Sequence, residues 1–327
     1  MKLNKKYLTI GISFIMLAVL LVLLSTIGSV DLSFNEIIKA LINDDNKVVT
    51  TIVYKMRLPR NILAALVGAN LAVAGILLQS VMKNPLADPG ITGVSTGASV
   101  AAIIILLLAP KYTNILPIVA FVGGAIACIL VFLMAYKNGI KPGRIVLAGV
   151  AVNTILGGII SFLSTMYSDR IQSAMLWLNG SLATKTWVDV NMLFGYSIIA
   201  LIVSLLLIRS ANVLQLGDEA ATNLGFNVNL TRLLISGVAV FLAAISTSVV
   251  GVISFVGLIV PHISRMIMGS DHKYTIPFSM VLGSIVLLVA DTLGRTIGGA
   301  IEIPVGVIMS IVGGPFFLYL LRKRGDY

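Results

Sequence analysis

Long apolar segments recur along almost the whole chain, and they constrain its fold more than any other feature. Each is about 17 to 25 residues long, which as a helix crosses about 30 Å of hydrocarbon. Only helices and closed barrels satisfy their backbone hydrogen bonds in that environment. We therefore predict an all-α polytopic membrane protein with about ten transmembrane helices, at residues 7–29, 61–82, 93–109, 115–136, 145–167, 191–209, 230–250, 252–268, 276–296 and 304–322.

Composition excludes a soluble core for these segments. Apolar residues make up 58% of the chain and charged residues only 11%, whereas a soluble domain has about 25% charged residues. The net charge of +10 is scattered between the apolar segments, which argues against a nucleic-acid partner and for membrane lipid. The one cysteine, Cys128, is expected to be a packing residue. We treat 1–327 as a single transmembrane domain.

Lysines and arginines set the expected orientation. Three lysines precede the first segment, which is too long for a signal peptide, so we expect an uncleaved span and a cytoplasmic N-terminus. Ten spans then return the C-terminus to the cytoplasm, with 14 Lys and Arg inside and 9 outside. The external segment 31–60 is an exception because it carries five of those nine, and its Ser33 and Glu36 form a capping-box pattern for a short helix.

The stretch from Arg57 to Ser99 shows how the spans are expected to pack. Ala64, Gly68 and Ala72 lie on one helical face and let another helix approach closely. The following segment, 84–90, holds two prolines and a glycine among turn-forming residues, so regular structure should stop there.

These strings and several later ones resemble the FecCD-type permease family, the membrane subunits of ABC importers for iron-siderophores, haem and cobalamin. The resemblance covers nearly the whole chain, with matching strings RLPR at 57–60, NPLADPGITGVSTGA at 84–98, LGDEAATNLG at 216–225, FVGLIVPHISRM at 255–266, LLVADTLGR at 287–295 and EIPVGVIMSIVGGPFFLYLL at 302–321. It implies a type II ABC importer permease fold, a bacterial cell membrane location, and an iron-siderophore as cargo, with haem or cobalamin as alternatives.

The resemblance also implies partners. A second permease subunit, either another copy or a paralogue, would complete the pathway, and an extracytoplasmic binding protein would deliver the cargo. Two cytoplasmic ATPases would bind ATP and magnesium, since this chain has no G-x-x-x-x-G-K-[ST] sequence. We expect no catalytic residue, metal or cofactor in this chain.

A cytoplasmic segment between spans six and seven has the pattern of a short helix. Asp218 and Glu219 would occupy its first turn, where acidic side chains are favourable, and Gly225 would end it. A plain connector is the alternative, although one with its own helix is uncommon. The segment is similar to the family's coupling helices, which contact the ATPase, so we expect that role for Leu216, Gly217, Asp218, Glu219, Ala220, Ala221, Leu224 and Gly225.

Two spans carry stripes of small or weakly polar residues at every fourth position. Such stripes suit close helix packing and equally suit the wall of a pathway. In the resembled family the fifth and tenth spans line the pathway. The expected lining is Gly149, Asn153, Gly157, Ser161 and Thr165, together with Gly306, Ser310 and Gly314. These faces have no charged ring that would select a bare ion, which favours a bulky chelate.

The inner loops at 84–88 and 137–144 end helices on either side of this pathway. Their prolines either set turns or allow a gate to hinge. Asn84 resembles a gate residue of the family, and we expect the gate to include Asn84, Pro85 and Leu86.

Three arginines, Arg57, Arg60 and Arg295, match positions that form a basic pocket for acidic residues of the binding protein in the resembled family. Taken singly, each is also explained as a snorkelling side chain at the membrane boundary. We expect Leu58-Pro59 to form a turn that holds Arg57 and Arg60 facing outward.

Other functional classes fit less well. The G-x-S-x-G pattern at 93–97 is typical of serine hydrolases, but it lacks their strand-turn-helix setting. His262 and His272 are expected at or beyond the cytoplasmic end of span eight, with His262 finishing a helix. An ion-coupled secondary transporter needs buried ionisable groups, and the main one, Asp291, is expected to pair locally with Arg295. A purely structural membrane protein is the remaining alternative.

Overall fold

The computed structural model describes residues 3–28, 33, 47–137, 139–298 and 301–323. The expected short helix after Ser33 therefore lies outside the described residues. Within them, seven helices are long and apolar enough to cross a membrane, and three shorter apolar helices accompany them. This confirms the expectation of about ten spans in an all-helical chain.

The ten spans follow one another with short elements between them. They are α1 (Leu3–Leu23), α4 (Leu58–Met82), α5 (Val94–Ile103), α6 (Leu116–Ala135), α7 (Pro142–Met166), α9 (Trp187–Leu206), α12 (Val228–Val250), α13 (Val256–Met268), α14 (His272–Ile297) and α15 (Val305–Lys323). The shorter elements are α3 (Lys47–Thr50), η1 (Thr51–Arg57), η2 (Pro89–Thr92), η3 (Ile104–Leu108), η4 (Pro110–Ile115), α8 (Ile171–Leu178), α10 (Ile208–Gln215) and α11 (Asp218–Asn223).

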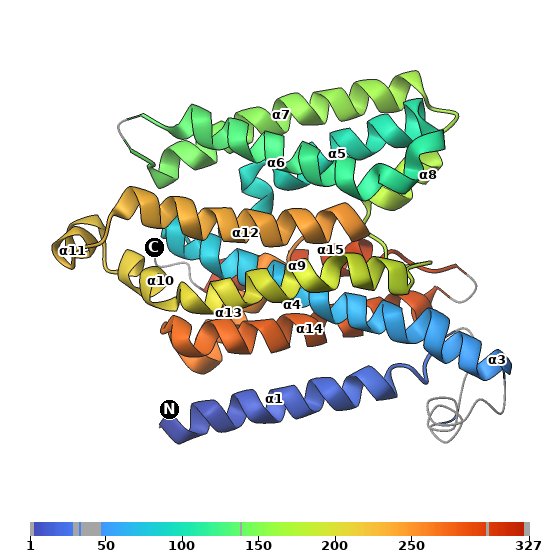
Figure 1. Cartoon of the computed structure of the whole chain (residues 1–327), viewed down its shortest axis with the longest axis horizontal. Helices are drawn as coiled ribbons and strands as arrows, with labels where there is room; N and C mark the ends of the chain where they lie inside the picture. The colour runs from blue at the N-terminus through green and yellow to red at the C-terminus, as the bar shows by residue number, and fades with distance from the viewer. Residues whose placement is uncertain (1–2, 29–32, 34–46, 138, 299–300, 324–327) are drawn as a thin grey trace.

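Helix α4 forms the centre of the bundle and packs against α9, α12, α13 and α14 (Figure 1). Its most apolar 18-residue window is 89% buried, whereas that of α1 at the periphery is 0% buried. A Cβ at Gly68 would overlap the carbonyl oxygen of Gly283, and one at Gly75 would overlap that of Gly257. The small-residue face predicted on this helix is buried as expected, with Ala64 and Ala72 fully inaccessible.

The two ends of the bundle differ in what they carry (Figure 1). At one end, called here the α11 end, lie α10, α11 and the start of α1. At the opposite end, the α3 end, lie α3 and the N-terminal turn of α4. Both marked chain termini lie toward the α11 end, as an even number of spans requires.

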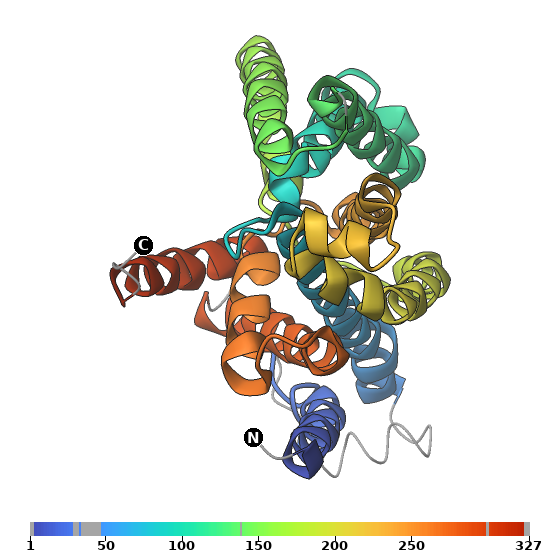
Figure 2. The ribbon, with the colours of Figure 1, turned by 90° about the vertical axis from the view of Figure 1, so that its left-hand side faces the viewer.

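Helices α7 and α15 project away from the central group in two directions (Figure 2). Both expose large apolar side chains, which in a membrane protein are covered by lipid or by another subunit. The most exposed are Leu147, Val150, Ile155, Phe162 and Met166 on α7, and Ile311, Val312, Leu318 and Tyr319 on α15.

Candidate docking, coupling and pathway sites

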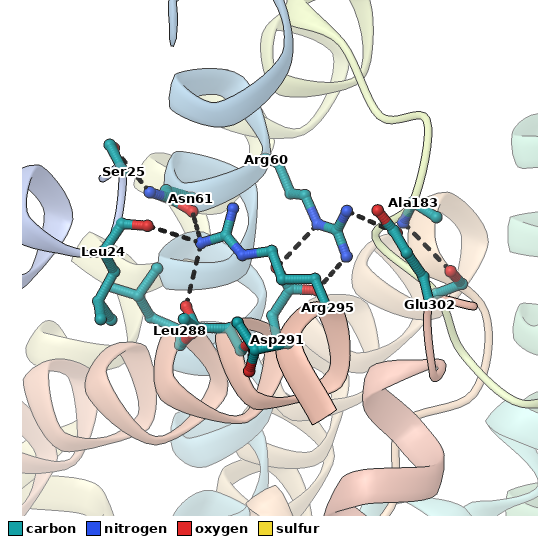
Figure 3. Close-up of polar contacts among 12 residues, drawn as sticks. Leu24, Ser25, Arg60, Asn61, Ala183, Leu288, Asp291, Arg295 and Glu302 are labelled. Carbon is teal, nitrogen blue, oxygen red and sulfur yellow. Dashed lines mark hydrogen bonds and ion pairs between the residues drawn. The ribbon is translucent and has the colours of Figure 1, made fainter. Parts of the chain in front are cut away.

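Arg60 lies at the centre of an ion-pair network at the α3 end (Figure 3). Its Nε and Nη2 donate to the two carboxylate oxygens of Asp291 on α14 at 2.8 and 3.0 Å, and its Nη1 donates to Oε2 of Glu302 at 2.8 Å. Asp291 is 1% exposed, whereas the Glu302 side chain is 46% exposed. A planar guanidinium suits this bidentate geometry, so Arg60 joins α4 to α14 and to the segment before α15.

Two further arginines join α1 to the bundle. Nη2 of Arg295 donates to the carbonyl oxygen of Leu24 at 2.9 Å and to Oδ1 of Asn61 at 3.0 Å. Nη1 of Arg57 donates to the carbonyl oxygens of Ser25 and its neighbour at 2.8 and 2.9 Å. Backbone carbonyls at the C-terminal end of a helix lack intrahelical N–H donors. The two arginines provide hydrogen-bond donors for these carbonyls where α1 ends.

The expected turn at Leu58-Pro59 is wrong, and so is the outward orientation of the arginines. A continuous helical stretch runs from Lys47 to Met82, with Pro59 in the first turn of α4. Proline is tolerated there because η1 ends in a π-helical pattern, with Leu58 donating to Val53, and the next carbonyl, of Tyr54, accepts from Nε1 of Trp187 instead of from residue 59. The three arginines are only 6 to 9% exposed. Their role in docking a partner stays a prediction.

The expected local pairing of Asp291 with Arg295 is also wrong. The carboxylate of Asp291 instead accepts two hydrogen bonds from Arg60, which lies 231 residues away in the sequence on α4. A buried carboxylate requires a partner that satisfies both oxygens, and Arg60 provides that geometry.

Helix α11 begins and ends as the sequence predicts. Gly217 before it has φ 110° and Gly225 after it has φ 81°, conformations that glycine adopts without strain. Ala221 is fully buried against the bundle, whereas Leu216 and Leu224 are 64% and 58% exposed. The two leucines therefore form an exposed apolar surface on this segment, and its role in ATPase coupling stays a prediction.

Asp218, in the first turn of α11, accepts from two cations with one oxygen. Its Oδ1 lies 2.6 Å from Nζ of Lys83 and 2.8 Å from Nη2 of Arg232. Partial burial alone would raise the pKa of Asp218, but the hydrogen bonds and charges of Lys83 and Arg232 hold it below its usual value. The carboxylate is therefore ionised at neutral pH.

The predicted gate residues directly follow α4, which Lys83 ends in a left-handed conformation with φ 48°. Oδ1 of Asn84 accepts from the amide of Leu86 at 2.9 Å, which folds the segment into a turn. A cavity of about 220 Å³ adjoins it, lined by Gln79, Lys83, Asn84, Pro85, Gln215 and Arg265. The segment thus has room on one side, and its gating role stays a prediction.

The stripe on α7 is divided between packing and exposure. Gly149 packs against the carbonyl oxygen of Ile91 so closely that a Cβ would overlap it. Nδ2 of Asn153 donates to the carbonyl oxygen of Gly90 at 3.0 Å, and its Oδ1 accepts from Thr96 at 2.7 Å. The stripe continues on the more open surface of the helix with Gly157, Ser161 and Thr165.

The stripe on α15 is divided in the same way. The amide of Gly306 donates to the carbonyl oxygen of Gly180 at 3.1 Å, and a Cβ at Gly306 would overlap the carbonyl oxygen of Asn179. Ser310 is exposed, and Gly314 has no atom within 4 Å of an added Cβ. Both readings of the stripes therefore apply to different parts of each helix, and the lining role stays a prediction.

Sequence reasoning missed Lys83, Arg232 and Glu302 as members of these sites. The one usable signal was Arg232, a charge inside the otherwise apolar segment 230–250.

His262 also differs from expectation, because α13 continues past it to Met268. Among the described residues, no group of three His, Cys, Asp or Glu could hold a metal ion.

Known proteins resemble this chain over most of its length. Residues 15–323 match the family model described as the FecCD transport family. The Fe(3+)-citrate import system permease proteins YfmE and YfmD of Bacillus subtilis (strain 168) are 38% identical over 316 residues and 39% identical over 300 residues. These alignments cover 95% of this chain and 95% of YfmE, and 91% of this chain and 89% of YfmD.

Two further similarities concern haem-iron transport and the fold. The Probable heme-iron transport system permease protein IsdF of Staphylococcus aureus (strain MSSA476) is 39% identical over 294 residues, covering 90% of this chain and 89% of IsdF. A solved metal-chelate type ABC transporter in an inward-facing conformation has a TM-score of 0.86 and 28% identity, covering 96% of this chain and 99% of that chain.

Proposed function

The chain belongs to the FecCD transport family, and on this premise we propose that it is the permease subunit of an ATP-driven importer that moves an iron chelate into a bacterial cell. The proposed cargo is a ferric siderophore or ferric citrate, with haem or cobalamin as alternatives. The stripes on α7 and α15 support a chelate, because their glycine, asparagine, serine and threonine residues are neutral and leave space.

The observation that carries this proposal is the exposed apolar surface of the α11 segment. Leu216 and Leu224 lie on a short helix at one end of a bundle that is otherwise built to span a membrane. Burying a leucine contributes about 1.5 to 3 kcal/mol, so two of them suit a partner-binding surface. Two cytoplasmic ATPase subunits would dock here and supply ATP hydrolysis, with ATP and magnesium bound to them.

The α11 end would therefore face the cytoplasm, with both chain termini on that side. This orientation would put Asn84, Pro85 and Leu86 at the cytoplasmic exit, where movement of the turn would open or close the pathway. The cavity described above, which adjoins the turn, gives room for that movement.

A second permease subunit would complete the pathway. The exposed apolar residues of α7 and α15 would meet it, and the open halves of their stripes would line the space between the two subunits. The two related permease proteins of the Bacillus Fe(3+)-citrate system suggest a paralogue as this partner, with a second copy of this chain as the alternative.

An extracytoplasmic binding protein would dock at the α3 end. Since Arg57, Arg60 and Arg295 are buried and internally bonded, docking would require an exchange of partners. Glu302 is the half-exposed partner of Arg60, so an acidic residue of the binding protein would replace it there. Asp291 would stay paired and hold Arg60 in place.

The test is uptake of radiolabelled iron by a strain lacking this chain. Ferric citrate, a ferric siderophore and haem are supplied separately, and restored uptake of one of them on re-expression identifies the cargo. Purification of the tagged chain in mild detergent should also recover an ATPase subunit. Normal iron uptake from all three sources without the chain, together with failure to recover an ATPase, would refute the proposal.

A further inference from the structure

Asp218 connects α11 to the two segments that end helices at the α11 end. On one side it holds Lys83, the residue before Asn84, and on the other it holds Arg232, which contacts Ile140. We propose that Asp218 is a positioning residue that transmits movement of α11 to segments 83–88 and 139–141. This inference rests on the permease function proposed above and adds a route through which ATPase movement reaches the pathway.

The first branch runs through Lys83. Its Nζ lies 2.6 Å from Asp218, and its own amide donates to the carbonyl oxygen of Gln79, which fixes it to the last turn of α4. Lysine adopts a left-handed conformation only at some cost, so its backbone is held by these contacts. Asn84 directly follows Lys83 in the chain. If α11 moves and pulls Nζ of Lys83 with it, the first residue of the gate segment is displaced as well.

The second branch runs through Arg232, whose side chain is only 4% exposed. Asp218 is its carboxylate partner within the described residues, and separating them would leave a buried cation without its counter-ion. Nη1 of Arg232 donates to the carbonyl oxygen of Ile140 at 2.9 Å, while the amide of Ile140 donates to Oδ1 of Asn229 at 3.1 Å. The start of α12 therefore holds both sides of Ile140.

The preceding helix, α10, has its own hydrogen bonds to the bundle, which do not involve α11. Oδ1 of Asn212 lies 2.6 Å from Nδ1 of His272, and Nδ2 of Asn212 donates to Asp271 at 2.8 Å. Nε2 of the same histidine lies 2.6 Å from Oγ of Ser80 on α4. These contacts tie α10 to α4 and α14.

Helix α11 instead adjoins a cavity of about 590 Å³ lined in part by Asp218, Arg232 and Lys141. It can therefore shift about Gly217 while α10 stays in place. In that movement Asp218 is the charged connection that both branches share.

The experiment uses the complete permease–ATPase complex in lipid. A fluorophore on Leu86→Cys, an exposed position that keeps its amide hydrogen bond to Asn84, reports the ATP-induced change of the gate segment, and co-purification reports ATPase docking. We expect Asp218→Asn to reduce the fluorescence change by about tenfold when the signal is normalised to the amount of ATPase that co-purifies. Lys83→Gln leaves the Arg232 pair in place, so it should fold normally and show a similar loss.

Two comparisons separate transmission from general destabilisation. The control variant Asp189→Asn disturbs the ion pair between Lys185 and Asp189 at 3.2 Å, which is less exposed than the Lys83–Asp218 pair. This pair lies near the α3 end, so its loss should leave the fluorescence signal unchanged. The double variant Lys83→Gln/Asp218→Asn should lose no more signal than the more affected single variant. The reason is that each substitution breaks the same Lys83–Asp218 ion pair.

Three results would count against specific claims. An unchanged fluorescence response in both Asp218→Asn and Lys83→Gln would overturn this inference while leaving the permease function intact. Additive losses in the double variant would overturn the shared link. Failure of the unmodified chain to bind an ATPase would refute the proposed function itself, and this inference with it.

Discussion

The ion pair between Arg60 and Asp291 allows a quantitative prediction about the stability of the bundle. We expect Asp291→Leu to destabilise the folded chain by about 3 to 5 kcal/mol, because it leaves a buried guanidinium without its bidentate partner. Arg60→Met should cost a similar amount, since the Asp291 side chain is 2% exposed and would be left as an isolated buried charge.

The double variant Arg60→Met/Asp291→Leu should be far less affected. It removes both buried charges and replaces them with apolar side chains, a change that is often neutral or stabilising. Glu302 would lose its partner too, but its half-exposed side chain can be hydrated. We therefore expect the double variant to lie within about 1 kcal/mol of the unmodified chain, with a coupling energy of about 5 kcal/mol or more.

The assay is reversible denaturant unfolding in mixed micelles, followed by the fluorescence of Trp177 and Trp187. A matched control, Lys185→Met/Asp189→Leu with its single variants, removes a more exposed pair and should show coupling of at most about 1 kcal/mol. If the Arg60 and Asp291 effects simply add, so that the double variant is less stable than either single one, the explanation from buried charge is refuted.

Four further predictions concern other parts of the chain. Gly75→Val should destabilise the bundle by about 3 kcal/mol or more, measured by the same unfolding assay, because a Cβ would overlap Gly257; unchanged stability would contradict the close approach. Leu224→Asp should abolish ATPase co-purification without loss of membrane insertion, and normal recovery of the ATPase would exclude that surface. Glu302→Gln should strengthen binding of the extracytoplasmic partner at low salt several-fold, since it removes a competing charge, and weaker binding would argue against an exchange at Arg60. The lowered pKa of Asp218 means that its contribution to stability is complete well above its ordinary value of 3.8 and is lost as pH falls through the lowered value. Unfolding measured from neutral pH down to about 5 should therefore show no titration that Asp218→Asn removes, and a titration of that kind above about pH 5 would contradict the lowered pKa.

The spans and the short helix α11 could be predicted because their signals are local. Apolar length fixes a membrane helix, and a glycine on each side of two acidic residues fixes the bounds of α11. The resemblance in strings such as NPLADPGITGVSTGA added the family, which the match over residues 15–323 bears out.

The partners of charged side chains could not be predicted in the same way. The sequence places Asp291 four residues before Arg295, and helix periodicity then favours a local pair. The actual partner, Arg60, is 231 residues away and approaches only because α4 and α14 pack together. The error at Leu58-Pro59 has a related origin, since proline is compatible with both a turn and a first helical turn.

The glycine contacts of α4 also limit how this protein can move. At Gly68 and Gly75 the backbone of α4 meets the backbones of α14 and α13 with no side chain between them. Because these contacts are backbone to backbone, rotation of either neighbour would bring side chains into a space that now holds none. We therefore expect α4, α13 and α14 to move together as one unit, so that probes attached to these three helices serve as reference points for measuring displacement elsewhere.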